Sequence, residues 1–509
     1  MNTDLSNTSP IYHPLTSGQR DVWLDQMVYP DVPFYNIGGY LRIDGHIDPV
    51  VFEQALRRVV QSNDALRIVL HKGNPLPVQE FRNDGVFDIP FIDFSEQKDP
   101  MQKAEAWMQA QFVRPFELYG HFLFRYAIIK VSDQCYCYFN NQHHLVADGL
   151  SILILTEQLS KEYNALMMDQ LSNEVPPSYH AFILEEQKFF QSKRCEQSKA
   201  FWQKIYKDLP EPLVSYPKRD TENDVPFRGG LSALRIKPSE YAVLEDFCKA
   251  QGVTPYHLLL AALYVCFLHN GIQKDFVYGA PVLNRSHAKA KKTIGLFTSV
   301  SPVRFCFGLD INTLDLLGLI SEELKRVYRY QRLPLGEINK LCGISQAFGR
   351  SLFDIGVSYE KNDYGMTFQG ARAQAITYSN GFERQALSIA LKEYRKGDDI
   401  ELDFSFNLQV FDAKEIDYLK HRVLFVMEEM VRNSHTNLNR LDILPASEKT
   451  DVLRGWNETQ KEIPKKLAHH FYEDCAKTMP EQLAAVCGQQ QMTYRVLNEQ
   501  ANQLSHYLT

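Results

Sequence analysis

The chain has 509 residues, of which 44% are hydrophobic and 23% charged, a composition typical of packed globular domains rather than disordered segments. At roughly 150 residues per domain, this length predicts two or three compact units. The net charge of −7 argues against a nucleic-acid-binding protein, because such a protein presents a dominant basic surface.

The first part of the sequence predicts alternating helices and strands. Apolar residues at helical spacing indicate helices, and short apolar or aromatic runs indicate strands. The helices are expected over 19–27, 50–62, 101–112 and 150–166, and the strands over 39–43, 122–131 and 135–139. The pattern breaks at Val175-Pro176-Pro177, which indicates a boundary between two lobes.

The second part has the same mixed character. Helices are expected over 238–251, from 254 onward, over 314–331 and over 413–432, and strands over 275–278, 352–359 and 400–408. The apolar run from Leu258 to Leu268 is much shorter than the about 20 residues of a transmembrane helix, so we interpret it as a buried helix. These elements predict an α/β protein with two lobes, 1–178 and 179–445.

The last part of the sequence changes in composition. Residues 446–466 are polar and contain proline, as expected of a linker. A helix over 467–477, a strand over 483–486 and a further segment over 492–508 follow. Residues 467–509 are too few to bury a core on their own, so they are predicted to be the beginning of another domain.

Cysteine usage and the N-terminus favour a cytoplasmic protein. Met1 to Ser6 lack the basic and apolar regions of a secretory signal. The nine cysteines include no C-x-x-C pair, which argues against a zinc site or a disulfide framework and favours reduced thiols.

The strongest chemical signal is His143-His144, followed by Asp148-Gly149, at the end of a predicted strand. Adjacent residues on an extended chain point to opposite faces, so one imidazole enters a cleft between the lobes while the other turns back into its lobe. This suits a base with a supporting residue, and it is poor for chelating one metal. A histidine pKa near neutrality suits removal of a proton from an amine or an alcohol. Asp148 would pair with an arginine, and Gly149 would supply backbone freedom for the turn into the next helix.

A structural interpretation of these residues stays open. An Asp before a helix is typical of an N-cap, and a lone histidine at a strand end is more often structural than catalytic. A second pair, His469-His470, has an Asp at the same spacing, but Cys475 stands where the glycine would be and no strand precedes it. We interpret this second pair as a coincidence on an exposed helix face.

His143-His144-x-x-x-Asp148-Gly149 resembles the HHxxxDG motif of condensation domains from nonribosomal peptide synthetases, which are similar to chloramphenicol acetyltransferase. Other segments resemble the family's motifs in the same order: Leu15 to Trp23, Asn63 to Arg67, Tyr179 to Trp202, Ile294 to Arg304 and Leu352 to Tyr359. The tail from Met492 to Leu504 resembles the opening of adenylation domains.

The resemblance implies two chloramphenicol-acetyltransferase-like lobes in a V-shaped pseudo-dimer, with the active site at their junction. Within it, His144 would position or deprotonate the acceptor amine. His143 and Asp148 would support it, and Gly149 would direct a backbone N–H toward the developing oxyanion. Arg67 and Arg285 are alternative partners for Asp148. The resemblance implies no metal and no covalently bound cofactor.

The implied reaction is amide formation, in which an acyl group is transferred to the α-amine of an aminoacyl thioester on the phosphopantetheine of a downstream peptidyl carrier domain. Asn284-Arg285 and Thr293 to Phe297 resemble starter condensation domains, which take a fatty or short acyl group from acyl-CoA or an acyl carrier and so begin N-acylated peptides such as lipopeptides. The resemblance begins close to Met1, which leaves no room for an upstream carrier and favours the same interpretation. An adjoining adenylation domain is the other implied partner, and neither nucleic acid nor a membrane span is implied.

Three alternatives differ in the chemistry they expect. An elongation condensation domain would accept a peptidyl donor from a carrier in trans. A non-catalytic docking platform would have lost motif residues, whereas His144, Asp148 and Gly149 are all present. An epimerisation domain shares the motif, but an adenylation start directly after the domain argues against it.

Overall fold

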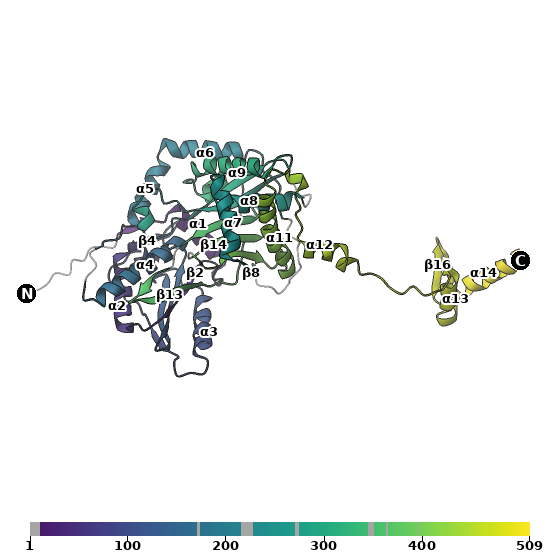
Figure 1. Cartoon of the computed structure of the whole chain (residues 1–509), viewed down its shortest axis with the longest axis horizontal. Helices are drawn as coiled ribbons and strands as arrows, with labels where there is room; N and C mark the ends of the chain where they lie inside the picture. Colours follow the sequence, from purple (N-terminus) through teal and green to yellow (C-terminus); the bar gives the residue numbers. More distant parts are fainter. Residues whose placement is uncertain are drawn as a thin grey trace, which may run out of the picture. The chain divides into compact units, whose positions relative to one another are not determined.

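The computed structural model describes residues 11–170, 174–214, 227–269, 274–344, 351–362, 365–394 and 397–509. Met1 to Ser6, on which we based the absence of a secretory signal, lie outside these residues. The chain forms two compact units, 1–445 and 446–509 (Figure 1).

The first lobe is built on a six-stranded sheet with the order β12-β13-β2-β7-β6-β5. Its strands from this part of the chain are β2 (Asn36–Asp44), β5 (Phe91–Asp93), β6 (Phe124–Ser132) and β7 (Cys135–His143). Helices α2 (Pro49–Ser62) and α4 (Gly149–Leu166) contact each other on one face, and α3 (Pro100–Phe112) covers the other (Figure 1).

Alternation along β7 explains this layering. Tyr136 and Tyr138 are buried with the apolar residues of α2 and α4, whereas Cys137 and Phe139 are buried with those of α3. Successive strand residues face opposite sides, so a run that is apolar on both faces needs a helix on each side.

The second lobe has its own six-stranded sheet, with the order β10-β9-β11-β14-β15-β8. Its strands are β8 (Gly229–Ile236), β9 (Asp275–Val282), β10 (Ser299–Cys306), β11 (Ile355–Lys361), β14 (Leu387–Glu393) and β15 (Ile400–Asn407). Its main helices are α7 (Pro238–Ala250), α8 (Pro255–His269), α9 (Thr313–Tyr328) and α11 (Ala413–Arg432). Helix α8 is buried along nearly its whole length and contacts α7, α9 and α11.

The second lobe contributes a segment to the sheet of the first lobe. Strands β12 (Thr367–Phe368) and β13 (Ala371–Thr377) follow β11 in the chain, yet β13 pairs antiparallel with β2 of the first sheet. The predicted lobe 179–445 includes these residues, whereas their hydrogen bonds place them in the sheet of the other lobe. Backbone hydrogen bonds between β13 and β2 therefore join the two lobes.

The remaining elements of the first unit connect the lobes or cover their ends. The first lobe also has a small sheet of β1 (Tyr12–Pro14), β4 (Val78–Phe81) and β3 (Ile68–His71), together with α1 (Ser17–Val28). Three helices follow the first lobe or lie within the second: α5 (His180–Phe190), α6 (Lys193–Ile205) and α10 (Leu335–Leu341).

The second unit is small. It comprises α12 (Ala446–Leu453), α13 (Ala468–Thr478), the hairpin β16 (Leu483–Cys487) and β17 (Gln490–Thr493), and α14 (Tyr494–Leu508). The segment 446–466, expected to be a linker, therefore begins with a helix. Every residue over 467–509 is exposed or half-buried, as expected for a segment too short to enclose a core.

Among the described residues, no single helix has the length and apolar composition needed to cross a membrane. Helices α7 and α8 meet that requirement only as a pair, and they are bent by 98° at the break between them.

Candidate active site

His143 is the last residue of β7 and is buried inside the first lobe. Its Nδ1 accepts a hydrogen bond from the Leu145 backbone N–H at 3.2 Å, and its Nε2 lies 3.4 Å from Oε1 of Gln26 on α1. Burial, together with the neighbouring His144, lowers the pKa of His143 to about 3. A neutral imidazole held on both nitrogens supports the loop and does not exchange protons near neutral pH.

His144 points the other way. Its backbone N–H donates to the Tyr35 carbonyl at 2.8 Å, and its half-buried side chain lines a cavity of about 840 Å³. Its Nδ1 is buried and has no hydrogen-bond partner among the described residues. Burial lowers the pKa of His144, although the Asp148 charge opposes the shift, so the imidazole is neutral near pH 7. A neutral, half-buried imidazole thus lines the cavity.

The cavity lies between the lobes. Its lining comes from β2, β13 and α4 on one side and from β9, β11, β14 and β15 on the other. Gly149, the first residue of α4, lines it together with His144. The first N–H groups of a helix have no partner within the helix, and the helix dipole places partial positive charge there, so this end of the cavity favours a developing negative charge.

The role predicted for Gly149 in the backbone is wrong. Gly149 is already in α4, and it is not among the residues with positive φ. A Cβ added there would meet no atom within 4 Å. Any residue could adopt this backbone, so the glycine matters for the space that it leaves open.

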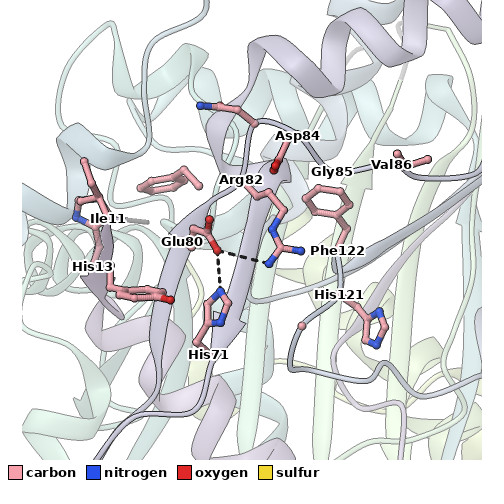
Figure 2. A pocket seen from close by; sticks show the side chains of 14 residues that line it. Ile11, His13, His71, Glu80, Arg82, Asp84, Gly85, Val86, His121 and Phe122 are labelled. Carbon is pink, nitrogen blue, oxygen red and sulfur yellow. Dashed lines mark hydrogen bonds and ion pairs between the residues drawn. The ribbon is translucent and has the colours of Figure 1, made fainter. Parts of the chain in front are cut away.

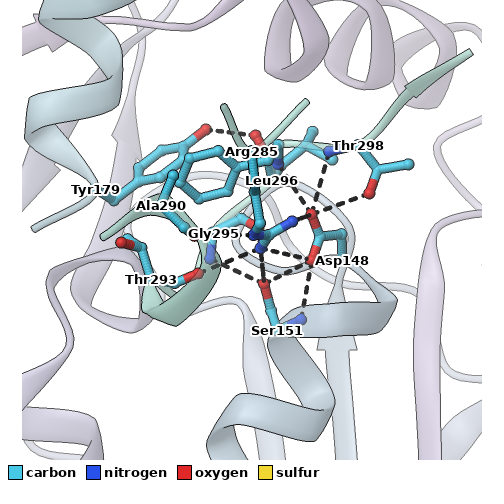
Figure 3. Close-up of polar contacts among 10 residues, drawn as sticks. Asp148, Ser151, Tyr179, Arg285, Ala290, Thr293, Gly295, Leu296 and Thr298 are labelled. Carbon is cyan, nitrogen blue, oxygen red and sulfur yellow. Dashed lines mark hydrogen bonds and ion pairs between the residues drawn. The ribbon is translucent and has the colours of Figure 1, made fainter. Parts of the chain in front are cut away.

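The Asp148 carboxylate accepts hydrogen bonds from residues of both lobes (Figure 3). It is the N-cap of α4, with Oδ1 accepting from the backbone N–H and the hydroxyl of Ser151 at 2.9 and 2.7 Å. Arg285 of the second lobe donates to both carboxylate oxygens, at 2.6 and 3.0 Å. The backbone N–H groups of Phe297 and Thr298, and the Thr298 hydroxyl, each donate to Oδ2 at 3.1 Å.

This cluster joins the two lobes. The side chains of Arg285 and Asp148 are 0% and 1% exposed, so the ion pair is excluded from bulk solvent. Burial alone would raise the pKa of Asp148, but the charge and hydrogen bonds of Arg285 and Ser151 outweigh it and hold the pKa below its usual value. The carboxylate is therefore ionised and fully occupied, which suits a structural role beside His144 rather than proton transfer.

Of the two arginines proposed as partners of Asp148, the structure brings Arg285 to it and places Arg67 elsewhere. The Arg67 guanidinium donates to the Arg82 carbonyl at 3.2 Å and to the Asn83 side chain. Arg67 leads directly into β3, and its partners follow the end of β4, so strand pairing within the small sheet fixes its position.

Gly295 allows the second lobe to close over Asp148. Its N–H donates to the Ser151 hydroxyl at 3.0 Å, and its carbonyl oxygen lies 2.8 Å from that hydroxyl oxygen. Its φ is +152°, and an added Cβ would lie 2.2 Å from the Tyr179 ring. The ring is itself held by a hydrogen bond from its hydroxyl to the Leu296 carbonyl.

We therefore expect Gly295→Ala to destabilise the first unit by about 1–3 kcal/mol, since both the clash and the backbone conformation disfavour a side chain. Urea-induced unfolding followed by circular dichroism measures the change. Gly252→Ala is a control for positive φ alone, because a Cβ there meets no atom within 4 Å. Equal losses in the two variants would contradict the argument from Tyr179.

Several residues of the site were missed at the sequence level. Gln26 and Tyr35 hold the two histidines, while Ser151 and Thr298 hold Asp148. Ser151 alone had a local signal, because it lies three residues after an N-cap Asp. The others come from distant segments that only folding brings together.

The histidine pair His469-His470 lies at the start of α13 in the second unit, and His469 is exposed. A second cavity, of about 1050 Å³, lies in the first lobe, and Figure 2 shows the side chains that line it. It is lined by His71, Glu80 and Arg82 among others and contains none of the predicted site residues. His71 and Arg82 both pair with the Glu80 carboxylate, so these polar groups satisfy one another.

Comparisons with known proteins relate the chain to one family. The family model described as "Condensation domain" matches residues 12–453. The chain is 25% identical to a dimodular nonribosomal peptide synthase of Bacillus subtilis over 99% of this chain, and 25% identical to surfactin synthase subunit 1 of the same species over 98%. It spans 21% and 14% of the length of these relatives.

Two solved structures share the fold. The starter condensation domain of rhizomide synthetase, in complex with C8-CoA, matches with a TM-score of 0.76 and 24% identity, covering 85% of this chain and 98% of that one. The first condensation domain of the calcium-dependent antibiotic synthetase matches with a TM-score of 0.75 and 23% identity, covering 86% and 100%. These matches confirm the predicted α/β fold with two chloramphenicol-acetyltransferase-like lobes.

Proposed function

Since this chain belongs to the condensation domain family, acyltransferases that form amide bonds in nonribosomal peptide synthesis, we propose that it is a starter condensation domain. The donor is a fatty or short acyl group on coenzyme A or on an acyl carrier. The acceptor is the α-amine of an aminoacyl thioester on the phosphopantetheine of a downstream peptidyl carrier domain.

The observation that carries the proposal is the neutral imidazole of His144, which lines the same cavity as the N-terminus of α4. In the proposed step the amine nitrogen attacks the thioester carbonyl, the C–N bond forms, the C–S bond breaks and the thiol leaves. His144 orients the amine, accepts its proton and passes it to the departing thiolate, and the Gly149 N–H stabilises the negative charge that develops on the carbonyl oxygen. His143, Asp148 and Arg285 hold this loop in place.

Two observations support the starter type. Asn284-Arg285 and the segment after it resemble starter domains, and the Arg285 side chain is part of the cluster around Asp148. The similar structure from rhizomide synthetase is a starter domain in complex with C8-CoA. The alternatives are an elongation domain that accepts a peptidyl donor in trans and a non-catalytic carrier-docking platform.

We further propose that residues 467–509 begin an adenylation domain that adjoins the condensation domain. The alignment with the B. subtilis synthase, which covers 99% of the chain, supports this. We also propose that the reaction takes place in the cytoplasm, where thiols such as those of the nine cysteines stay reduced.

The experiment offers acyl-CoAs of increasing length, an acyl carrier donor and a peptidyl carrier donor to the chain together with an aminoacyl-loaded carrier domain. Intact mass of the acceptor carrier gives the product. We expect N-acyl product from acyl-CoA or the acyl carrier. Product from the peptidyl carrier alone would establish the elongation type, and no product from any donor would leave the docking platform.

A further inference from the structure

The cavity beside His144 has one unusually polar wall. Strands β11, β14 and β15 of the second sheet present to it six residues, called here the polar wall: Ser358, Glu360, Ser388, Lys392, Asp403 and Ser405. The strand register brings them together, since Ser388 is opposite Ser405 and Glu360 is opposite Lys392. Their neighbours along the strands, such as Leu391, Leu402 and Phe404, are buried in the core of the second lobe.

Asp403 has an unused acceptor in this wall. Its residue is 8% exposed, and its Oδ2 accepts from the Lys392 ammonium at 2.7 Å. Its Oδ1 is buried and has no hydrogen-bond partner in the described part of the chain. A buried carboxylate oxygen without a donor is costly, so the wall is complete only when something in the cavity donates to it.

Lys392 is positively charged beside Asp403 and Glu360. Burial would lower the pKa of Lys392, but the Glu360 and Asp403 charges outweigh it and raise the pKa above its ordinary value. Glu360 accepts a hydrogen bond from the Tyr394 hydroxyl at 3.0 Å, whereas Oδ1 of Asp403 has no donor among the described residues. The wall therefore has one buried carboxylate oxygen whose donor has to come from a ligand.

The facing wall is mostly apolar. Ile37 and Leu41 of β2 and Leu150 and Ile152 of α4 line it. Tyr378, just after β13, also lines the cavity, and its hydroxyl is buried with no partner among the described residues. A ligand that fits both walls has an apolar stem and a polar substituent that can donate hydrogen bonds.

We propose that the polar wall binds a hydroxyl or amino substituent on the substrate chain that occupies this cavity. The inference rests on the proposed function and narrows its substrate class. An unbroken alkyl chain would cover Asp403 and Lys392 without forming hydrogen bonds to them. A short chain with a donor group would form a hydrogen bond to Asp403 Oδ1. The substituent belongs either to the acyl donor or to the side chain of the aminoacyl acceptor.

Two sets of competition reactions distinguish these sources. In the first, hexanoyl-CoA competes with its 3-hydroxy, 6-hydroxy and 6-amino derivatives for one aminoacyl carrier. In the second, one acyl-CoA is used with carriers loaded with norleucine or lysine, and with valine or threonine. We expect one set to show at least a tenfold preference for the donor-bearing substrate, read as the product ratio by intact mass.

The test variant is Lys392→Met with Asp403→Leu, which replaces the ion pair with apolar side chains of similar size. We expect it to lose the preference while it still accepts the apolar substrates. The matched control is Arg235→Met with Glu401→Leu, an ion pair with a closest approach of 3.5 Å on β8 and β15 that does not line the cavity. This control should keep the preference. Ser405→Ala is a milder second variant in case the double variant does not fold, and a partial loss is expected.

A preference that is absent in both sets, or unchanged in the Lys392/Asp403 variant, would overturn the inference. Binding separates it from the proposed function. Calorimetry with N-acetylcysteamine thioesters of the same acids and amino acids reports the preference without turnover. Equal affinities for the apolar and donor-bearing thioesters would refute the polar wall even if amides form, whereas a tenfold affinity difference would support it even if they do not.

Discussion

Asp148→Ala is expected to destabilise the first unit by about 3–5 kcal/mol, the usual cost of leaving a buried charge without its partner. The variant removes a carboxylate that accepts seven hydrogen bonds and leaves the Arg285 guanidinium unpaired at 0% exposure. Because the donors come from both lobes, we expect the loss to loosen the junction as well as the loop.

Urea-induced unfolding of the full chain measures the difference. Asp44→Ala is the control, since Asp44 pairs with Arg42 on the surface at 53% and 44% exposure and should cost less than about 1 kcal/mol. Asp148→Leu combined with Arg285→Met removes both charges and should recover much of the loss. If Asp148→Ala cost no more than Asp44→Ala, the cluster would not hold the lobes together.

The sign of the pH dependence follows from the lowered pKa of Asp148. A carboxyl whose pKa is lower in the folded state stabilises that state above its unfolded pKa, and the contribution is lost as pH falls through the folded value. The difference between wild type and Asp148→Ala should therefore be constant from about pH 5 to 8 and shrink below about pH 4.

His144→Ala is expected to lower the rate of amide formation by about 10²- to 10⁴-fold, the range typical of losing a positioned general base. Its effect on unfolding should be much smaller than that of Asp148→Ala, because the neutral, half-buried imidazole lines a cavity and leaves no buried charge without its partner when removed. Single-turnover reactions with saturating donor and acceptor measure the rate. His469→Ala, in the exposed histidine pair, is the matched control and should react like wild type.

The pH profile distinguishes a base from a positioning group. An α-amine has a pKa of about 7.7–8, so above pH 9 the acceptor is already free and a group that only captured its first proton would be dispensable. If His144 orients the amine and takes the proton released during attack, the deficit of His144→Ala persists at pH 9. If His144→Ala regained the wild-type rate at pH 9, or if its rate deficit were below about tenfold, His144 would not be the main catalytic group. The N-terminus of α4 and substrate positioning would then account for most of the rate.

The local pattern of the sequence was enough to predict much of the first unit. The apolar stripe of α2 and the long α4 lie close to their predicted bounds, whereas the strand predicted over 135–139 continues to His143. Such elements follow from periodicity, since the spacing of apolar residues determines which face is buried. The position of His143-His144 at the end of a strand, and of Asp148 at the start of a helix, follows from the same local rules.

The spacing of apolar residues does not specify which element packs against a buried face or which residue pairs with a buried charge. The choice of Arg285 over Arg67 depends on packing that joins residues 137 positions apart. The pairing of β13 with β2 depends on a strand edge in the other lobe. The alternation of apolar and polar residues along β13 does not specify which strand edge it pairs with. The polar wall likewise needed the register of three strands. The sequence by itself determined the elements and the chemistry of the motif, whereas the tertiary structure decided which distant groups satisfy each buried charge, because that is set by how the two lobes pack.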